Sequence, residues 1–493
     1  MSSLRFWRGR NEKGSFDKDI LGFDLLYQLS YMSAIAASGV SRGQLFEMGA
    51  QLPCPAARYF KDITQLSKKM NYDYAESCRI VGERAKDEGV RSLLLRLSGS
   101  LASGEQAMDF FKQEAAIQAE HYANDYEQKL ESLRKWTDAF TALIISAALI
   151  IVVAAISMLI YKVSFLFVLI LMAGTIAVGI VGAWVVHRSA PKELKAPPVE
   201  GCKRLDRANS LFKILCPMAL VFPVFFLAAG LPVGLTLVLG AALLFPVGMA
   251  SLLYDRDRDR KDGEISTFLR TLGNVGTAIG TTITEALDRI DFRSMASLKP
   301  EVKKLRTRLF ARIRPDLCWR RFVADTGSPL IGYSVRMFQD ATNLGGEAEE
   351  VGARSSVLAM RVTSLRAKRR IVSSPFGYLC IVMHAVVALL LLFISEVIGI
   401  FGSTIGTIEV EGAMASSVGM LNFDPAGLHL FDLVLGVVLL AMCVINAFAA
   451  MAADGGYKYK YFFYLSGTLG ATGLAFLLVP RMTGMMFDFT PGM

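Results

Sequence analysis

The sequence has few of the residue types from which metal and redox sites are built. Its four histidines lie far apart along the chain. Its cysteines are also dispersed, and none is spaced from another as zinc or iron–sulfur ligands are. The seven are Cys54, Cys78, Cys202, Cys216, Cys318, Cys380 and Cys443. This pattern is typical of reduced thiols packed as small apolar side chains, so we expect no metal and no cofactor.

Signatures of nucleotide binding, hydrolysis and export are missing as well. The segment "GTAIGTT" (276–282) is not followed by Gly-Lys-Ser/Thr, so it is not a phosphate-binding loop. No Ser/His/Asp set, HExxH motif or pair of carboxylates stands out. The polar start of the chain lacks the 7–15-residue apolar core of a cleaved signal peptide. These absences argue against an enzyme and against a removed leader.

Charge is scarce, and apolar residues collect in long runs. Only 20% of the 493 residues are charged and 53% are hydrophobic, and the runs include "AFTALIISAALIIVVAAISMLIY" at 139–161. Runs near 20 residues match a hydrocarbon layer of ~30 Å at 1.5 Å per helical residue. We predict a polytopic membrane protein with seven spans, at 139–161, 163–186, 211–229, 231–254, 377–401, 430–453 and 461–480.

The distribution of bases predicts the orientation of these spans. If residue 1 is inside, only Lys162 and Arg481 of the 53 bases lie in outer segments. Short loops rich in Lys and Arg remain on the cytoplasmic side, and long domains carry less weight in this rule. The outer loop 402–429 contains three acids and no base. We therefore expect a cytoplasmic N-terminus and an external C-terminus in the cytoplasmic membrane.

The two predicted soluble blocks resemble each other when one is shifted by 241 positions. "AIAASGVSRGQLFE" (34–47) then lies over "VGTAIGTTITEALD" (275–288), and "LSGSLASGEQAMDF" (97–110) lies over "FQDATNLGGEAEEV" (338–351). Gly39 falls on Gly280 and Gly104 on Gly345, which indicates a duplication. Leu, Met and Ala recur at helical spacing before Gly39, so these glycines are interpreted as helix C-caps rather than ligand-cradling residues.

We thus predict an all-α fold with two related cytoplasmic helical bundles on extended stalk helices. The expected parts are bundle 1 (1–138), spans one to four with a cytoplasmic linker at 187–210 (139–254), bundle 2 (255–376), and spans five to seven with the outer loop (377–493). One stalk is the alternating run Asp255, Arg256, Asp257, Arg258, Asp259, Arg260 and Lys261. Opposite charges three and four residues apart support a helix there, so we interpret the run as a solvated rod that ends at Gly263.

The motifs "ASGVSRGQLFE" and "LASGEQAMDFF", a long helix entering the membrane, and a second copy of both together resemble the type II secretion F-domain family. Its members are inner-membrane platform proteins of type IV pili, Tad-type pili and archaella. The resemblance covers about 25–160 and 265–400, and two copies with seven spans are more similar to the archaeal branch. The outer loop 402–429 departs from the repeat, because it aligns with the second span.

The resemblance implies a non-enzymatic role in filament assembly or secretion. It implies that a cytoplasmic hexameric ATPase docks on the platform, that pilin-like subunits are the cargo, and that the protein forms a small homo-oligomer. It leaves open whether the filament is an adhesive pilus, an archaellum or a secretion pseudopilus.

The second block carries an excess of positive charge that the first block lacks. Block 1–138 has 19 bases and 19 acids, whereas 255–374 has 23 bases and 15 acids. Most of the excess lies in Lys299, Lys303, Lys304, Arg306, Arg308, Arg312, Arg314, Arg320 and Arg321. These bases fit an acidic face of the ATPase, anionic lipid or plain solvation. Nucleic acid is not expected, because aromatic residues are not interleaved with the bases.

A transporter or channel is the alternative function. Such a protein is expected to hold charged or polar pairs in the middle of the membrane. The ionisable residues we find within spans, Lys213, Glu396 and Asp432, lie toward span ends. This distribution favours the platform over the transporter. A second cluster of bases, Arg366, Lys368, Arg369 and Arg370, is interpreted as an ordinary anchor at the inner membrane surface.

Overall fold

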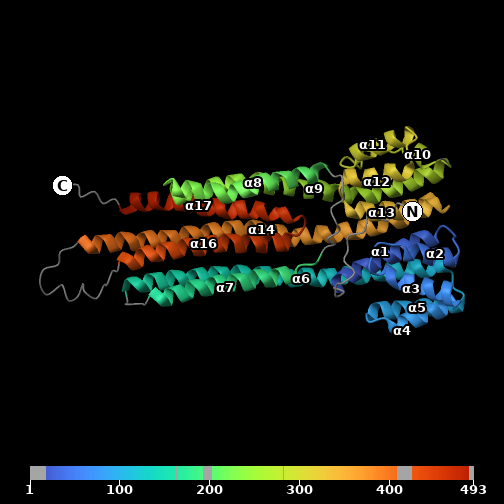
Figure 1. Ribbon diagram of the computed structural model, residues 1–493, viewed down its shortest axis with the longest axis horizontal. Coiled ribbons are helices and arrows are strands. Elements are labelled where there is room, and N and C mark those ends of the chain that lie inside the picture. The colour runs from blue at the N-terminus through green and yellow to red at the C-terminus, as the bar shows by residue number, and fades with distance from the viewer. Residues whose placement is uncertain (1–17, 161–164, 193–202, 281, 408–424, 488–493) are drawn as a thin grey trace. The chain divides into compact units, whose positions relative to one another are not determined.

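The computed structural model of the chain describes residues 18–160, 165–192, 203–280, 282–407 and 425–487. Within these ranges the regular structure is helical and no strand occurs, so the predicted all-α class is confirmed. The expected turn at Lys162 and most of the expected outer loop lie outside the described residues. Two compact units are present, and α6, α8, α9 and α14 contribute residues to both (Figure 1).

Unit 1 comprises Met1–Gln128, Pro191–Asp206 and Arg256–Ala367. It contains two successions of six helical segments. The first succession is α1 (Lys18–Ala36), α2 (Arg42–Ala50), α3 (Ala57–Met70), α4 (Tyr74–Arg84), α5 (Glu88–Ser103) and the start of α6 (Ala107–Ile160). The second is the end of α9 (Val233–Ile279), α10 (Ile283–Ala286), α11 (Lys299–Phe310), α12 (Pro315–Thr326), α13 (Pro329–Asn343) and the start of α14 (Ala348–Thr407).

The helix boundaries repeat with the offset seen in the sequence. The starts of α2 and α10, α4 and α12, α5 and α13, and α6 and α14 are each 241 residues apart, while α3 and α11 start 242 apart. The four repeat glycines have φ of 66°, 80°, 62° and 91° at Gly39, Gly104, Gly280 and Gly345. A side chain at any of them would meet open space. Glycine is therefore favoured there by the left-handed backbone that ends a helix, and not by lack of room.

The two successions pack together through α1. From residue 21 onward nearly every α1 side chain is buried, the polar ones included. Tyr27 lies against Tyr333 of α13 with ring centroids 4.4 Å apart, and the Tyr31 hydroxyl donates to Asp340 at 2.8 Å. The Ser38 hydroxyl donates to the carbonyl of Ala341 at 2.7 Å. A single helix thus belongs to the core of one copy and to the interface with the other.

Unit 2 comprises Lys129–Ala190, Arg207–Asp255 and Lys368–Met493. Its own helices are α7 (Phe165–Ser189), α8 (Lys203–Ala228), α16 (Pro425–Asp454), the 3₁₀ turn η3 (Lys458–Lys460) and α17 (Tyr461–Phe487). Six helices among the described residues are long and apolar enough to cross a membrane: α6, α7, α9, α14, α16 and α17. The third predicted span falls within α8, where only a shorter apolar segment, Asn209–Pro223, is found.

Glycines allow close helix contacts in both units. In unit 2, a Cβ at Gly234 of α9 would lie 2.8 Å from the carbonyl oxygen of Gly473 in α17. In unit 1, a Cβ at Gly273 would lie 2.3 Å from the carbonyl oxygen of Ala348. A Cβ at Gly352 would lie 2.6 Å from the Leu269 carbonyl oxygen. The backbones of α9 and α14 therefore touch where no side chain fits between them.

We expect Gly273→Ala to destabilise unit 1, because the added methyl group meets backbone that cannot turn aside. The cost of such overpacking is about 1–3 kcal/mol, measured as a lowered Tm of the purified protein. Gly263→Ala is the matched control on the same helix, because a Cβ there meets open space and alanine favours a helix over glycine. Equal effects of the two substitutions would contradict the close contact.

Candidate partner-docking surface

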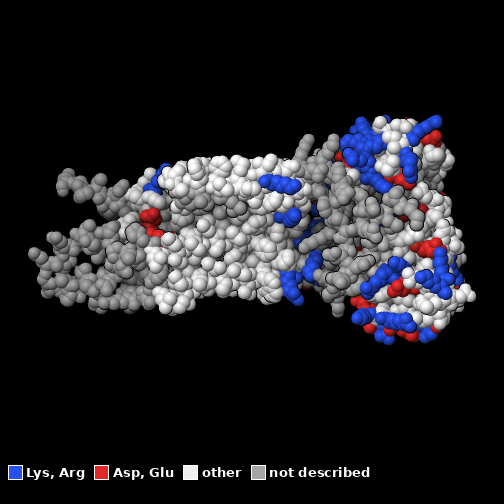
Figure 2. Space-filling view, viewed as in Figure 1, with Lys and Arg blue, Asp and Glu red and all other residues white. Residues whose placement is uncertain are grey.

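The nine predicted basic residues lie together on α11, on α12 and on the turn between them. Figure 2 shows Lys and Arg gathered over these elements. Seven of the nine side chains are exposed, whereas Arg306 and Arg308 are half-buried. The opposite face of α11 carries Val302, Leu305 and Leu309, which are buried in the core of the second copy. The amphipathic pattern of α11 therefore turns its lysines outward.

Acidic neighbours hold four of the nine bases in place. Arg306 lies 2.8 Å from Asp288, and Arg308 lies 2.7 Å from Asp325. Arg321 is 3.7 Å from the same Asp325, and Arg314 is 3.8 Å from Asp316. The other five have no ion-pair partner among the described residues, so their charge is uncompensated. We name these five the basic surface: Lys299, Lys303, Lys304, Arg312 and Arg320.

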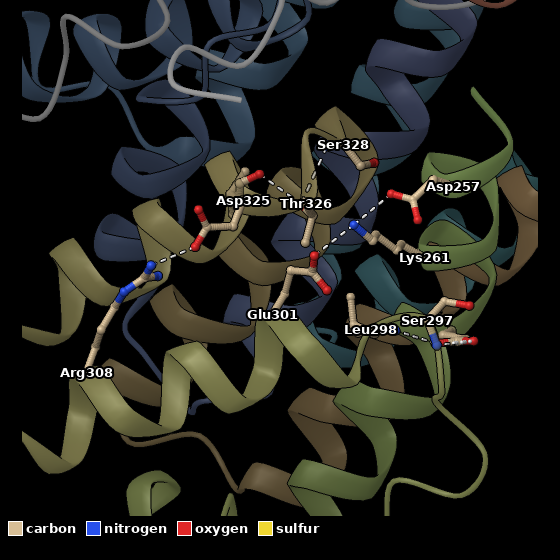
Figure 3. Close-up of polar contacts among 11 residues, drawn as sticks. Asp257, Lys261, Ser297, Leu298, Glu301, Arg308, Asp325, Thr326 and Ser328 are labelled. Atoms are coloured by element: carbon tan, nitrogen blue, oxygen red, sulfur yellow. Dashed lines mark hydrogen bonds and ion pairs between the residues drawn. The ribbon is translucent and has the colours of Figure 1, made fainter. Parts of the chain in front are cut away.

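A buried ion pair attaches α11 to α9 beneath the basic surface (Figure 3). The Lys261 ammonium lies 2.9 Å from Glu301 of α11 and 2.9 Å from Asp257, one turn earlier on α9. Lys261 is 2% exposed and Glu301 is 7% exposed. Because a charge removed from water is costly without a partner, these two side chains depend on each other. The pair fixes the base of α11 against α9.

A second contact from α9 caps the start of α11. The Glu264 carboxylate accepts hydrogen bonds from the backbone N–H groups of Ser297 at 3.1 Å and Leu298 at 2.7 Å. Leu298 itself supplies no side-chain cap. The first N–H groups of a helix have no partner within it, and a carboxylate there is further favoured by the helix dipole. Glu264 therefore replaces the missing local cap.

A third contact, again a buried ion pair, joins α9 to α14. Asp262 is 1% exposed and lies 2.7 Å from Arg366. Burial raises the pKa of Asp262, while the nearby Arg366 and Arg258 guanidinium groups oppose that rise. With Lys261 and Glu264, Asp262 makes the middle of α9 the attachment point for both α11 and α14. The prediction that Arg366 is an anchor at the inner membrane surface is wrong, because its guanidinium group pairs with Asp262 inside unit 1.

The predicted solvated rod at Asp255–Lys261 is only partly correct. The run is helical, and Asp257 and Lys261 form the expected contact four residues apart. However, α9 continues through Gly263 to Ile279, and Asp255 and Lys261 are each 2% exposed. Among the charges of the run, Arg256 and Arg260 are the exposed ones. Tertiary partners that are distant in sequence bury the other side of the helix, and sequence spacing along α9 cannot reveal them.

Unit 2 contains a polar network between the middle of α9 and the C-terminal end of α16. Asp255 accepts a hydrogen bond from the backbone N–H of Tyr457 at 2.9 Å. Lys460, which is 7% exposed, lies 2.6 Å from Asp454. The Arg369 guanidinium donates to the carbonyls of Ala453 at 3.1 Å and Ala452 at 3.2 Å. From the sequence we interpret Arg369 as a basic residue that anchors the chain at the inner membrane surface. In the structure its side chain caps the C-terminus of α16, where the helix dipole favours a cation.

A buried polar cluster lies within the predicted spans, where the sequence indicates none. His384 of α14 is 0% exposed, and its Nε2 lies 2.8 Å from the Thr472 hydroxyl of α17. Cys443 and Asn446 of α16 lie 3.1 Å from Nε2 and Nδ1 of the same ring. The signal available in the sequence is a set of single polar residues on separate apolar helices. Hydrogen bonds of this kind tie membrane helices together.

No group of three or more His, Cys, Asp or Glu side chains suited to a metal occurs among the described residues. The His384 cluster contributes one imidazole and one thiol, together with an amide and a hydroxyl. The His384 ring, the Cys443 thiol and the Thr472 hydroxyl lie within hydrogen-bond distance of one another, whereas Oδ1 of Asn446 is buried without a partner among the described residues. The cluster therefore joins α14, α16 and α17.

We expect Lys261→Met to lower the free energy of unfolding by about 3–5 kcal/mol, because it leaves the buried Glu301 carboxylate of α11 without this cation. Thermal and denaturant unfolding of the purified protein measure the loss. Arg260→Met is the control, since Arg260 is the exposed neighbour on the same helix. The double variant Lys261→Met with Glu301→Gln should recover part of the loss. Full stability of the single variant would contradict the attachment of α11 by this pair.

Taken together, the long apolar helices and the duplicated six-helix arrangement define a multi-pass, all-helical membrane protein with a two-copy helical unit. Comparison with known proteins gives a more specific relationship. The chain is 21% identical over 445 residues to flagella accessory protein J of Methanococcus voltae, covering 87% of this chain and 79% of that protein. It is 23% identical over 410 residues to flagella accessory protein J of Methanocaldococcus jannaschii, covering 80% and 72%.

These two matches confirm the predicted resemblance: over most of its length the chain is similar to flagella accessory protein J. No family model and no solved structure matches the chain.

Proposed function

We propose that this protein is the membrane platform of an archaellum. In this role it couples a cytoplasmic hexameric ATPase to the assembly of pilin-like subunits into a filament. The observation that carries the proposal is the relationship to flagella accessory protein J over most of the chain. The role is non-enzymatic, so the energy comes from the partner. The duplicated helical unit is then the part that receives the force.

We propose that both copies of unit 1 are cytoplasmic and that α8 is a seventh span. The charge distribution supports this, because 51 of the 53 bases then lie inside and short basic loops stay in the cytoplasm. The number of spans has a direct consequence. With seven spans the termini lie on opposite sides, whereas with six they lie on the same side.

Single cysteines introduced at Ser67 and near the C-terminus, in a background without native cysteines, test this topology. We expect a membrane-impermeant maleimide added to intact cells to label position 490 but not position 67. Broken cells serve as the control in which both positions react. Labelling of position 67 in intact cells would place the first copy outside and refute the proposed platform. Protection of both positions would reduce the number of spans to six.

We propose that the basic surface on α11 and α12 contacts an acidic face of the ATPase. Three features support this role. The surface carries five bases without ion-pair partners among the described residues, its helix is held by buried contacts to α9, and the first copy lacks a matching charge excess. Complementary charge raises association rates and selects the partner. The attachment to α9 would pass a push on α11 to the helix that continues into the predicted fourth span.

We expect Lys303→Glu, Lys304→Glu, Arg312→Glu and Arg320→Glu together to weaken ATPase binding by at least roughly tenfold at low salt, and less at high salt, because screening removes the charge term. Arg306 and Arg308 stay unchanged, since reversal there would break ion pairs of the fold.

The measurement is co-purification of a secretion-type ATPase and pilin-like subunits with the full-length protein from native membranes. A matched control reverses Lys61, Arg84 and Arg91, which are exposed bases of the first copy. Binding that is unchanged at every salt concentration would remove the docking assignment. Absence of the ATPase from the wild-type preparation would contradict the platform itself. The same preparation reports whether the protein is a homo-oligomer.

A further inference from the structure

The turn between α11 and α12 exposes large apolar side chains that the core does not use. Phe310 is 52% exposed, Ile313 is 45% exposed and Leu317 is 48% exposed. They surround Arg312, which has a left-handed backbone with φ of 55°. Single exposed apolar residues are common on protein surfaces. Three at one turn, beside a strained residue, form a small apolar projection.

The first copy has a similar projection at the equivalent turn, between α3 and α4. Met70 is 65% exposed and Tyr72 is 44% exposed. They flank Asn71, whose φ is 57°. Asn71 and Arg312 are 241 residues apart, and they are the residues other than glycine with positive φ in the described part of the chain. Tyr72 and Ile313 each follow the left-handed residue directly.

The two turns share their backbone and their exposed apolar character without sharing side chains. The first turn reads Lys-Met-Asn-Tyr (69–72) and the second reads Phe-Ala-Arg-Ile (310–313). The left-handed backbone costs about 1–2 kcal/mol at Arg312, whereas asparagine tolerates it at the C-terminal end of α3. Leaving apolar area in water forgoes a stabilisation of roughly 25 cal/mol per Å². Two sequences that differ at every position of the turn both keep the left-handed backbone and the exposed apolar area, which points to a shared use of the turns.

Exposed bases accompany both turns. Lys68 and Lys69 end α3, and Arg312 and Arg314 follow α11. We name the two turns with these flanking bases the twin tips: tip 1 is 68–72 and tip 2 is 310–317. An apolar centre bordered by bases fits a pocket that is apolar inside and carries carboxylates at its rim.

We propose that the twin tips insert into two equivalent pockets of one partner built from identical subunits, each pocket apolar with an acidic rim. This rests on the proposed function, in which the partner is a ring of identical subunits. A chain with two equivalent tips in one compact unit fits a partner that repeats the same pocket. Two contacts formed together raise the overall affinity well above that of either alone.

A lipid surface fits the tips less well. Tip 1 is followed by Asp73 and by Glu76, which is itself paired with Arg79 at the surface. Asp316 lies within tip 2 and is exposed. A uniformly anionic headgroup layer would repel these acids, whereas a protein pocket can accommodate them individually. A membrane also imposes no requirement that the two tips occupy equivalent positions in the repeat.

The test uses the full-length protein in detergent and the hexameric secretion-type ATPase of the same organism, with the dissociation constant measured by surface-immobilised binding. One variant carries Met70→Asp and Tyr72→Asp, a second carries Phe310→Asp and Ile313→Asp, and a third carries all four. Leu95→Asp on α5 is the matched control, because Leu95 is a large apolar residue that is 37% exposed but lies on neither tip.

We expect each two-residue variant to weaken binding by roughly tenfold or more, and the four-residue variant to weaken it further, as for buried apolar anchors acting together. The control should bind as the wild type does. Wild-type affinity of either two-residue variant would overturn the twin arrangement while leaving the platform role intact. Failure of the wild-type protein to bind the ATPase would overturn both. Loss of binding to phosphatidylglycerol vesicles, with ATPase binding unchanged, would assign the tips to lipid and overturn the inference.

Discussion

The ammonium group of Lys261 is buried and therefore needs carboxylate partners. Several contacts of unit 1 lie around this pair. Its partner Glu301 begins the helix that carries the basic surface. The next two acids on α9, Asp262 and Glu264, hold α14 and the start of α11. A buried pair of this kind adds little net stability compared with apolar packing, but losing one partner is costly. A different placement of α11 against α9 would leave the buried ammonium and the Glu301 carboxylate apart.

Duplication has produced two copies whose helices start at matching positions and whose packing differs. In the first copy α1 is buried along most of its length and packs against α13 of the second. The equivalent part of α9 is amphipathic, with buried charges toward α11 and α14. The interface is therefore between unlike faces of the two copies.

Polar groups in unit 2 stabilise helix ends and contacts between helices. Arg369 caps α16, and Lys460 joins Asp454 at the turn that follows it. Deeper in the predicted spans, His384 links α14 to α16 and α17 through neutral hydrogen bonds. Each buried donor or acceptor left without a partner would cost about 1–3 kcal/mol. The apolar helices are similar in hydrophobicity. These polar contacts therefore determine which helices pair with one another.

The sequence by itself determined the helical class, the long apolar segments, the offset of 241 and the identity of the basic residues. Those features depend on local properties: apolar run length, helical periodicity, and the left-handed backbone that favours Gly39 or Gly280 at a helix end. Tertiary structure alone decided that Lys261 and Asp255 are buried, that Arg366 and Arg369 serve the fold rather than lipid, and that His384 meets Thr472. Those outcomes depend on partners from about 40 to 200 residues away, and charge spacing along a single helix contains no information about them.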